Sequence, residues 1–411
     1  MNALMAAASS EAHEVDSRYA WFRLGIALLL STIGSVGMWS VVVALPAVQI
    51  EFAVARADAS LPFTLTMFGF GLGGVILGRI ADRWGIVIPI LLAAAALGAG
   101  YVLSGFATTL WQFALAQGAL IGFGCSAAFG PMLADISHWF VRRRGIAVAV
   151  CASGNYLAGA VWPPIVQYFI STEGWRATQI GIGIFCFVTM TPLAFALRRQ
   201  AAARPAEDSI AVTAAQGTLG VSPKTLQALL IVAGLACCVA MSMPQVHIVA
   251  YCGDLGYGVA RGAEMLSIML AFGIVSRIAS GFIADRIGGL RTLLLGSVLQ
   301  GVALALYLGF DGLASLYIIS ALFGLFQGGI VPSYAIIIRE YFSPREAGTR
   351  VGVVIMATLI GMAWGGWTSG KIFDLTGSYQ AAFLNGLAWN LLNVTIVLWL
   401  LLRPARKLAA A

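Results

Sequence analysis

Charged side chains are scarce in this chain of 411 residues, since Asp, Glu, Lys and Arg make up only 10% of it. A typical soluble domain carries about a quarter charged residues, so this composition argues against a soluble globule. Cysteine is also sparse, and its six residues have no paired loop spacing that would indicate a disulfide framework or a metal site. We interpret the cysteines as small apolar packing residues.

Motifs for common enzyme chemistry are missing as well. The sequence has no phosphate loop of Walker type, no cluster with metal-ligand spacing and no nucleophile elbow. We therefore expect no enzyme activity, no cofactor and no metal. ATP-driven transport would need a nucleotide-binding domain, which the sequence does not contain.

Long apolar runs are what the chain has in abundance. Hydrophobic residues make up 60% of it, and many runs reach the length of about 18 residues that can cross a hydrocarbon core of about 30 Å. Continuous runs differ from the alternating strands of a lipid-facing barrel. We predict an all-α membrane protein with twelve spans: 21–48, 61–80, 86–106, 110–137, 145–169, 177–197, 225–251, 262–284, 290–310, 313–338, 347–370 and 379–402.

The distribution of basic residues gives the orientation. Most of the 24 lysines and arginines fall on the side that holds both termini, whereas Arg56, Arg176, Arg261 and Lys371 fall on the opposite side. The positive-inside rule then places both termini in the cytoplasm of an inner (plasma) membrane protein. The net charge of +7 is on this view a topology signal, and we expect no nucleic-acid partner.

Two charged octapeptides bounded by glycine interrupt the apolar runs. "GRIADRWG" covers residues 78–85 and "GFIADRIG" covers residues 281–288, so that Asp82 and Asp285 are 203 residues apart. "GWRAT" at 174–178 and "GSYQA" at 377–381 have the same offset, which predicts a duplication of two six-helix halves. The expected parts are a tail at 1–20, a first half at 21–197, a linker at 198–224, a second half at 225–402 and a tail at 403–411.

This doubled motif resembles the signature loop of the major facilitator superfamily, and the resemblance covers nearly the whole chain. It implies two six-helix halves with the substrate path between them and a cytoplasmic loop that latches the halves together. The motif positions are Gly78, Asp82, Arg83, Gly85, Gly281, Asp285, Arg286 and Gly288. Physically, Gly78 and Gly281 would let helices approach closely, and each aspartate would cap the following helix. The alternative is that these charges are solvated residues that only fix topology.

Arg277 is the one basic residue predicted away from both membrane interfaces. It precedes Asp285 by eight residues, or about 12 Å along a helix, which places it near the midplane. Its counterpart in the first half is Gly74, so the duplication does not require a charge there. A buried guanidinium costs about 2.5–3.5 kcal/mol on insertion scales, and a bidentate carboxylate would offset this cost. The alternative is a structural ion pair, with Asp135 as its partner.

Three stretches narrow the resemblance to the monocarboxylate transporter group, which includes the bacterial oxalate:formate antiporter. They are "SRIASGFIADRIG", "HWFVRRRGIAVAVCASGNYLAG" and "YFSPREAGTRVGVV". In that group an arginine at the position of Arg277 binds the substrate carboxylate. The resemblance implies that Arg277 is the anion clamp here.

The other site positions depart from the group. Thr358 stands where the antiporter has a lysine for a second carboxylate, and Phe129 stands at an aromatic position of span 4 without a hydroxyl. Asn155 replaces a tyrosine, and Gln327 replaces a tryptophan. These departures argue against oxalate, because one buried cation fits one carboxylate. We expect the four residues to line the cavity.

Two titratable residues are candidates for proton coupling. His247 lies in the outer part of span 7, and its side chain titrates near neutral pH. It can equally be a histidine hydrogen-bonded between helices. Asp135 lies about one turn inside span 4, where it is a candidate proton site or the partner of Arg142 or its neighbours in a gate.

The sequence thus favours a secondary transporter that moves a small organic anion, a monocarboxylate, by alternating access with proton symport. Its partners would be the anion, protons and the lipid bilayer, and we expect a monomer. Three alternatives remain: an anion exchanger of the oxalate:formate type, a facilitator that exports a hydrophobic compound, and a transporter-like membrane sensor.

Overall fold

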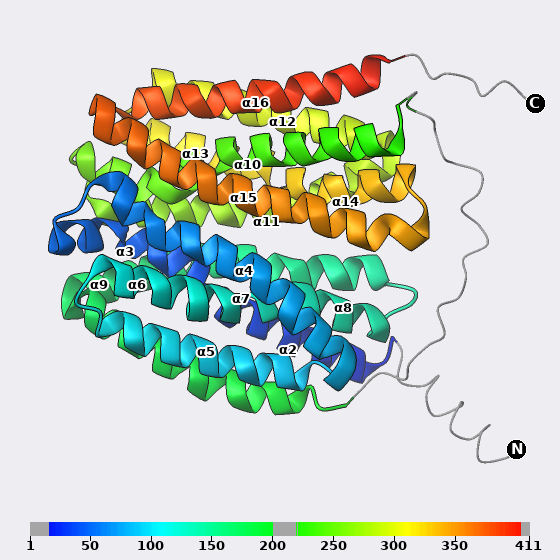
Figure 1. Ribbon diagram of the computed structural model, residues 1–411, viewed down its shortest axis with the longest axis horizontal. Helices are drawn as coiled ribbons and strands as arrows, with labels where there is room; N and C mark the ends of the chain where they lie inside the picture. Colours follow the sequence, from blue (N-terminus) through cyan, green and yellow to red (C-terminus); the bar gives the residue numbers. More distant parts are fainter. Residues whose placement is uncertain (1–15, 200–218, 220, 404–411) are drawn as a thin grey trace, which may run out of the picture. The chain divides into compact units, whose positions relative to one another are not determined.

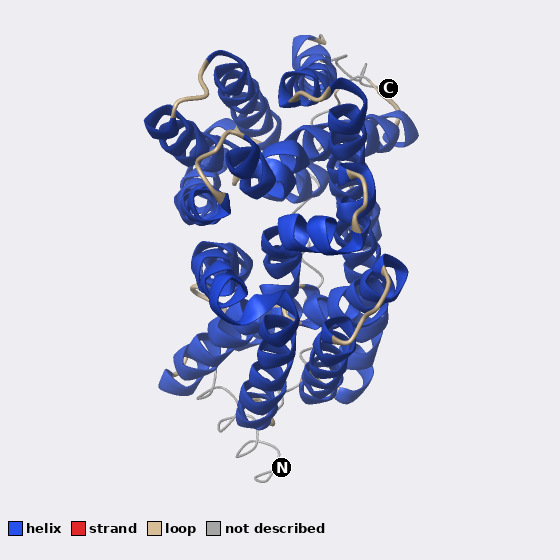
Figure 2. Ribbon diagram, turned by 90° about the vertical axis from the view of Figure 1, so that its left-hand side faces the viewer, coloured by secondary structure: helices blue, strands red, loops and turns tan. Residues whose placement is uncertain are grey.

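The computed structural model describes residues 16–199, 219 and 221–403, and within them the chain is helical without a strand (Figure 2). Most of the two predicted tails and of the predicted linker lies outside the described residues. The elements are α2 (Arg18–Gly34), α3 (Val36–Phe52), α4 (Arg56–Trp84), α5 (Val87–Gly105), α6 (Leu110–Ala116), η1 (Gln117–Gly122), α7 (Phe123–Ala127), α8 (Gly130–Trp139), α9 (Arg144–Ala196), α10 (Pro223–Asp254), α11 (Val259–Ile287), α12 (Gly289–Gly309), α13 (Leu313–Gln327), α14 (Ile330–Tyr341), α15 (Pro344–Thr376) and α16 (Tyr379–Leu402).

Eleven helical stretches of the described chain are long and apolar enough to cross a membrane. One of them, Gly145–Ala196, has 52 residues, which would extend about 78 Å as a single helix, well over two hydrocarbon cores. Its helical path is interrupted at Gly174, where φ is 82° and ψ is 157°. The predicted spans 145–169 and 177–197 lie on either side of this interruption.

The backbone repeats with the offset seen in the sequence. Helices α4 and α11 each have 29 residues, and they begin at positions 203 apart. Positive φ angles recur at three pairs of positions with this spacing: Gly85 and Gly288, Gly174 and Gly377, and Ala53 and Gly256. A positive φ is uncommon outside glycine, so three matched pairs are strong evidence that the two repeats share one backbone design.

The chain divides into two units. The first comprises Met1–Val48 and Leu65–Glu207, and the second comprises Gln49–Thr64 and Asp208–Ala411. In the first unit α9 packs against α2 and α5, and in the second α10 packs against α15 and α16 while α11 packs against α13 (Figure 1). The second unit therefore includes residues 49–64, which precede and begin α4 and belong to the first sequence repeat.

Apolar side chains cover much of the helices' outer surface. The most apolar window of α16 is only 28% buried, and large residues such as Leu72, Phe106 and Phe282 are exposed. A soluble protein rarely exposes continuous apolar faces of this kind. Such faces are suited to lipid, as expected for a membrane protein.

Candidate functional site

Arg277 lies in the second half of α11, in a turn that also contains two serines. Its side chain is half-buried, Ser276 is buried, and the Ser280 hydroxyl donates to the Arg277 carbonyl at 3.0 Å. The preceding turns bury Met269 and Leu270. The arginine is thus a cation in the inner part of a helix whose other charged residues lie near its two ends.

The junction of α13 and α14 lies against this turn of α11. A methyl group on Gly328 would touch Ser276, and one on Gly329 would collide with Ser280, so only glycine permits the approach. Gln327 directly precedes this glycine pair and is fully buried. Neither atom of its side-chain amide forms a hydrogen bond within the described residues. An unsatisfied buried amide is costly, which makes Gln327 a functional candidate.

His247 is fully buried in α10 and contacts α15. Its Nε2 lies 2.8 Å from the carbonyl oxygen of Gly366, and its ring centroid is 5.9 Å from that of Tyr379. Because a carbonyl only accepts, Nε2 carries the hydrogen in the neutral ring and Nδ1 keeps its lone pair. Nδ1 has no hydrogen-bond partner among the described residues. His247 thus forms a hydrogen bond between helices, as the structural interpretation expects. It also keeps one nitrogen that could accept a proton, as the coupling interpretation requires.

Thr358 is a buried residue of α15 whose hydroxyl donates to the carbonyl of Ile355 in the same helix at 2.7 Å. Its methyl group faces Gly234 of α10, where an added Cβ would lie 3.2 Å away. These contacts are those of a packing residue, and the hydroxyl is already satisfied by its own helix.

The two candidates of the first unit contact α3 and α4. Asn155 in α9 donates to the sulfur of Met38 at 3.0 Å, and its backbone carbonyl accepts from Trp39 Nε1 at 3.1 Å. Phe129 is half-buried just before α8, and its ring centroid is 6.2 Å from that of Phe70. Both residues fix neighbouring helices in place.

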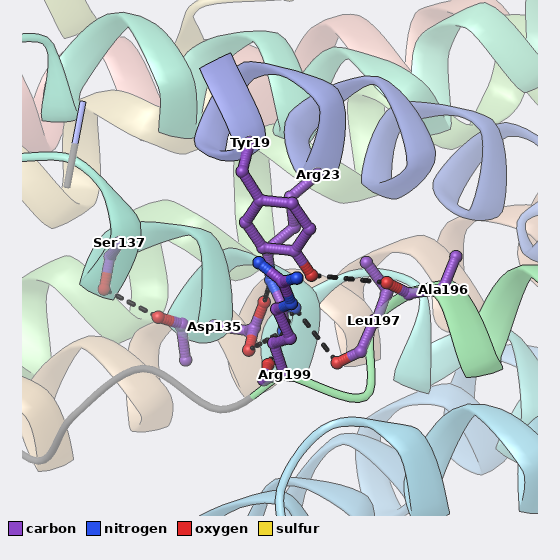
Figure 3. Close-up of polar contacts among 8 residues, drawn as sticks. Tyr19, Arg23, Asp135, Ser137, Ala196, Leu197 and Arg199 are labelled. Atoms are coloured by element: carbon purple, nitrogen blue, oxygen red, sulfur yellow. Dashed lines mark hydrogen bonds and ion pairs between the residues drawn. The ribbon is translucent and has the colours of Figure 1, made fainter. Parts of the chain in front are cut away.

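Asp135 forms a bidentate ion pair with Arg23 of α2 (Figure 3). Arg23 Nη2 and Nε lie 2.7 and 2.9 Å from the two carboxylate oxygens, and the guanidinium stacks on Trp139 at 4.6 Å. Arg23 Nη1 also donates to the carbonyls of Leu197 and Arg199, just after α9. The cation therefore satisfies the orphan carbonyls at a helix C-terminus. The sequence did not suggest Arg23 as the partner.

The octapeptides differ from the expectation in two respects. No described atom lies within 4 Å of a Cβ placed on Gly78 or Gly281, so the prediction of close helix approach at these glycines is wrong. The capping prediction is also wrong, because Asp82 and Asp285 lie inside the last turns of α4 and α11, and neither α5 nor α12 is capped by the side chain of its own N-cap residue. Asp82, Arg83, Asp285 and Arg286 are all exposed.

The closing glycines, and not the aspartates, shape these turns. The Gly85 and Gly288 amides donate to the carbonyls of Ala81 and Ala284 at 2.8 and 2.9 Å, with positive φ at both glycines. The start of α12 is held instead by Glu340 of α14, whose carboxylate oxygens lie 2.9 and 3.2 Å from the amide of the residue after Gly288. A carboxylate at this position favourably meets the positive end of the helix dipole.

A family model described as the Major Facilitator Superfamily matches residues 27–308 and 265–411. This chain belongs to the major facilitator superfamily. Transporters form this superfamily, and the all-helical membrane architecture agrees with it.

Relatives within the superfamily are named for monocarboxylates. Monocarboxylate transporter 13 of Rattus norvegicus is 27% identical over 335 residues, which cover 79% of this chain and 75% of the relative. Monocarboxylate transporter 12 of Homo sapiens is 25% identical over 376 residues, which cover 81% and 70%. The chain is therefore a monocarboxylate transporter-like member of the superfamily.

Solved structures of two transporters share the fold. A bacterial homologue of the human lysosomal transporter Spinster, in an inward-facing and occupied conformation, aligns with a TM-score of 0.70 and 16% identity over 94% of this chain and 95% of that one. A mutant nucleoside transporter aligns with a TM-score of 0.73 and 13% identity over 93% and 99%. At these identities the likeness shows the fold alone.

Sequence reasoning about this facilitator missed several buried polar residues. Arg23 and Arg56 were counted only as topology signals, yet they are 1% and 7% exposed. Gln117 begins the π-helical segment η1, and its buried amide forms no hydrogen bond within the described residues. π-Helical segments are frequent at functional sites, but no periodicity in the sequence marks this one. In the same residues, no group of three His, Cys, Asp or Glu is placed to hold a metal.

Proposed function

We propose that this facilitator moves a small organic anion, a monocarboxylate, across the membrane by alternating access coupled to proton symport. The observation that carries the proposal is a half-buried arginine, Arg277, on the turn of α11 against which the α13–α14 junction packs, together with the unsatisfied buried amide of Gln327 at that junction. The names of the relatives support the same substrate class.

The chemistry of this pair suits one carboxylate. The guanidinium is planar and offers two parallel N–H donors that match both carboxylate oxygens. The amide of Gln327 adds a further neutral donor, which becomes satisfied only when a ligand or another conformation supplies an acceptor. The position at which the resemblance expects a second cation is Thr358, whose hydroxyl bonds its own helix. This favours a monocarboxylate over a dicarboxylate.

Proton coupling is assigned to His247. The neutral ring donates from Nε2 to Gly366 and leaves the lone pair of Nδ1 open to a proton. Protonation would add a charge to a fully buried site, so it should be favourable only together with an anion or a change of conformation. For Asp135, the bidentate contact with Arg23 supports the interpretation as a gate ion pair more than as a proton site.

For the rest of the architecture, we propose twelve spans, counting Gly145–Ala196 as two that meet at Gly174. The halves would be 21–197 and 225–402, joined by a linker at 198–224. The protein would be a monomer in the inner (plasma) membrane with both termini cytoplasmic, as the basic residues indicate. Asn155 and Phe129 would lie on the first half's side of the substrate path, and the octapeptides would form the cytoplasmic gate.

The test is uptake of labelled small acids into proteoliposomes by the wild type, Arg277→Lys and Arg277→Ala. Lysine keeps the charge but lacks the two parallel N–H donors of the guanidinium. We therefore expect at least about tenfold weaker monocarboxylate binding, because a hydrogen bond to a charged group contributes about 1.5–3 kcal/mol. Alanine should abolish binding. Binding is measured separately in detergent, so that affinity and transport rate are resolved.

The matched control is Arg261→Ala, which removes an exposed arginine from the same helix. It should transport like the wild type. Wild-type uptake by Arg277→Ala would refute the clamp. Loss of folding by Arg277→Ala, with Arg261→Ala intact, would instead support a structural ion pair.

A further inference from the structure

Arg56, the first residue of α4, is a buried arginine in a site built by three helices of the second unit. Its guanidinium lies 3.1 Å from Asp254 Oδ2 at the end of α10, and Nη1 donates to the Tyr379 hydroxyl at the start of α16. The guanidinium also stacks on Phe373 of α15, 4.7 Å from the ring centroid. A carboxylate, a phenol and an aromatic face together suit a guanidinium.

The backbone at the start of α4 is bound as well. The two oxygens of Asp374 accept from the amides of Arg56 and Ala57, each at 2.8 Å. Gly370, one turn earlier in α15, leaves room for Ala57, since a Cβ there would lie 3.0 Å from its Cα. A carboxylate from α15 thus caps α4 and meets the positive end of its dipole.

The duplication does not require this arrangement. At an offset of 203, Arg56 corresponds to Val259, Asp374 corresponds to Ser171 and Tyr379 corresponds to Arg176. The second repeat therefore begins its equivalent helix, α11, with a valine at the position of Arg56, and that helix has no side-chain cap. Because the second repeat forms the same backbone without these contacts, the contacts around Arg56 are not required by the backbone that the repeats share.

Water can reach the ion pair from one side. A cavity of about 350 Å³ is lined by Asp254, Phe373 and Tyr379, together with Tyr251 and Asp311. The Asp254 side chain is 39% exposed, whereas that of Arg56 is 8% exposed. If Arg56 left this site, water from the cavity could solvate Asp254 and Tyr379, which we call, together with Asp374, the receptor of Arg56. Separating the ion pair therefore costs less than separating one that is fully shielded from water.

We infer that Arg56 and its receptor form a reversible latch between the start of α4 and the α10–α15–α16 ends, which opens once in each transport cycle. The inference rests on the proposed function, because alternating access requires residues 49–64 to leave the second unit when the path opens at this end. The latch consists of Arg56, Asp254, Asp374 and Tyr379. Its contribution is to favour the state in which it is closed.

Hydrogen exchange by mass spectrometry on the purified chain, without substrate, tests the latch. In Arg56→Ala we expect about tenfold faster exchange in residues 49–64 and also in the receptor segments around 251–254 and 370–379, because hydrogen bonds to a charged group have been removed. Arg261→Ala is the control and should leave all three segments unchanged, since its pair with Glu264 is exposed. Asp254→Asn breaks the ion pair but keeps the Asp374 cap, and it should give a smaller change of the same pattern.

Faster exchange confined to the first turn of α4 would mean local fraying and would overturn the latch, as would no change. If Arg56→Ala does not fold, Asp254→Asn decides by the same criterion. No substrate is present, so failure of monocarboxylate transport would leave this result untouched.

Discussion

Two buried arginines have their positive charges compensated by the same kinds of partner, from different parts of the chain. Arg23 is paired with Asp135 and lies over Trp139, and Arg56 is paired with Asp254 and lies over Phe373. In each case a carboxylate compensates the charge, and an aromatic ring covers the flat face of the guanidinium. Burial of a charge is tolerated only with such partners, so loss of one partner should be costly.

For Arg23 we predict a non-additive double-mutant cycle. Arg23→Met should lower the free energy of unfolding by about 3 kcal/mol, because Asp135, 16% exposed, would lose its cation. Asp135→Leu should cost a similar amount, and the double variant should lose clearly less than the sum. Thermal unfolding in detergent measures all three variants. Arg261→Met, which breaks an exposed pair, serves as the control and should cost less than about 1 kcal/mol. Additive losses would contradict a specific pair.

At the scale of the element, the octapeptides end their helices through glycine. Gly288 has φ 83° and ψ 164°, a region that is essentially restricted to glycine, and it separates α11 from α12. Gly281, seven residues earlier in the same motif, is inside α11 and has open space around it. The two glycines of one motif therefore have different physical requirements.

We predict that Gly288→Ala destabilises the protein by about 1–3 kcal/mol, because alanine cannot adopt this backbone without strain. Gly281→Ala, the matched control, should be neutral or slightly stabilising, since alanine favours a helix. Thermal midpoints of the two purified variants check this. Equal midpoints would show that the turn at Gly288 relaxes when it is substituted.

The elements could be predicted where the signal is local. The apolar runs and the octapeptide spacing located the helices and the duplication, because hydropathy and glycine positions are visible along the chain. The partners of Arg23 and Arg56 could not be predicted, since Asp135 is 112 residues from Arg23 and Asp254 is 198 residues from Arg56. Asp285 was expected to cap α12, but α11 continues past it, so Glu340 from α14 takes that position.

For the whole molecule, the duplication copies the backbone but not the chemistry. Three pairs of positive φ angles match between repeats, whereas Arg277 corresponds to Gly74 and His247 corresponds to Ala44. The two residues to which the proposed function assigns anion binding and proton coupling, Arg277 and His247, are therefore present in only one repeat. On that proposal, coupling between proton and anion is carried by side chains of the second repeat.

We predict that His247→Gln separates transport from proton coupling. Glutamine can still donate to Gly366, but it cannot take up a proton. Counterflow of a monocarboxylate at equal pH should persist in proteoliposomes, and accumulation driven by a pH gradient should be lost. Accumulation at the wild-type level would show that His247 is not needed for proton coupling.

The six cysteines have a practical consequence. All are free and buried, at Cys125, Cys151, Cys186, Cys237, Cys238 and Cys252. A thiol must be accessible as a thiolate to react, so the native chain offers a water-soluble maleimide little to modify. One cysteine introduced at an exposed loop position can then carry a fluorophore or a spin label, with the natural sequence as its blank. The chain is already suited to single-molecule observation without first removing its own thiols.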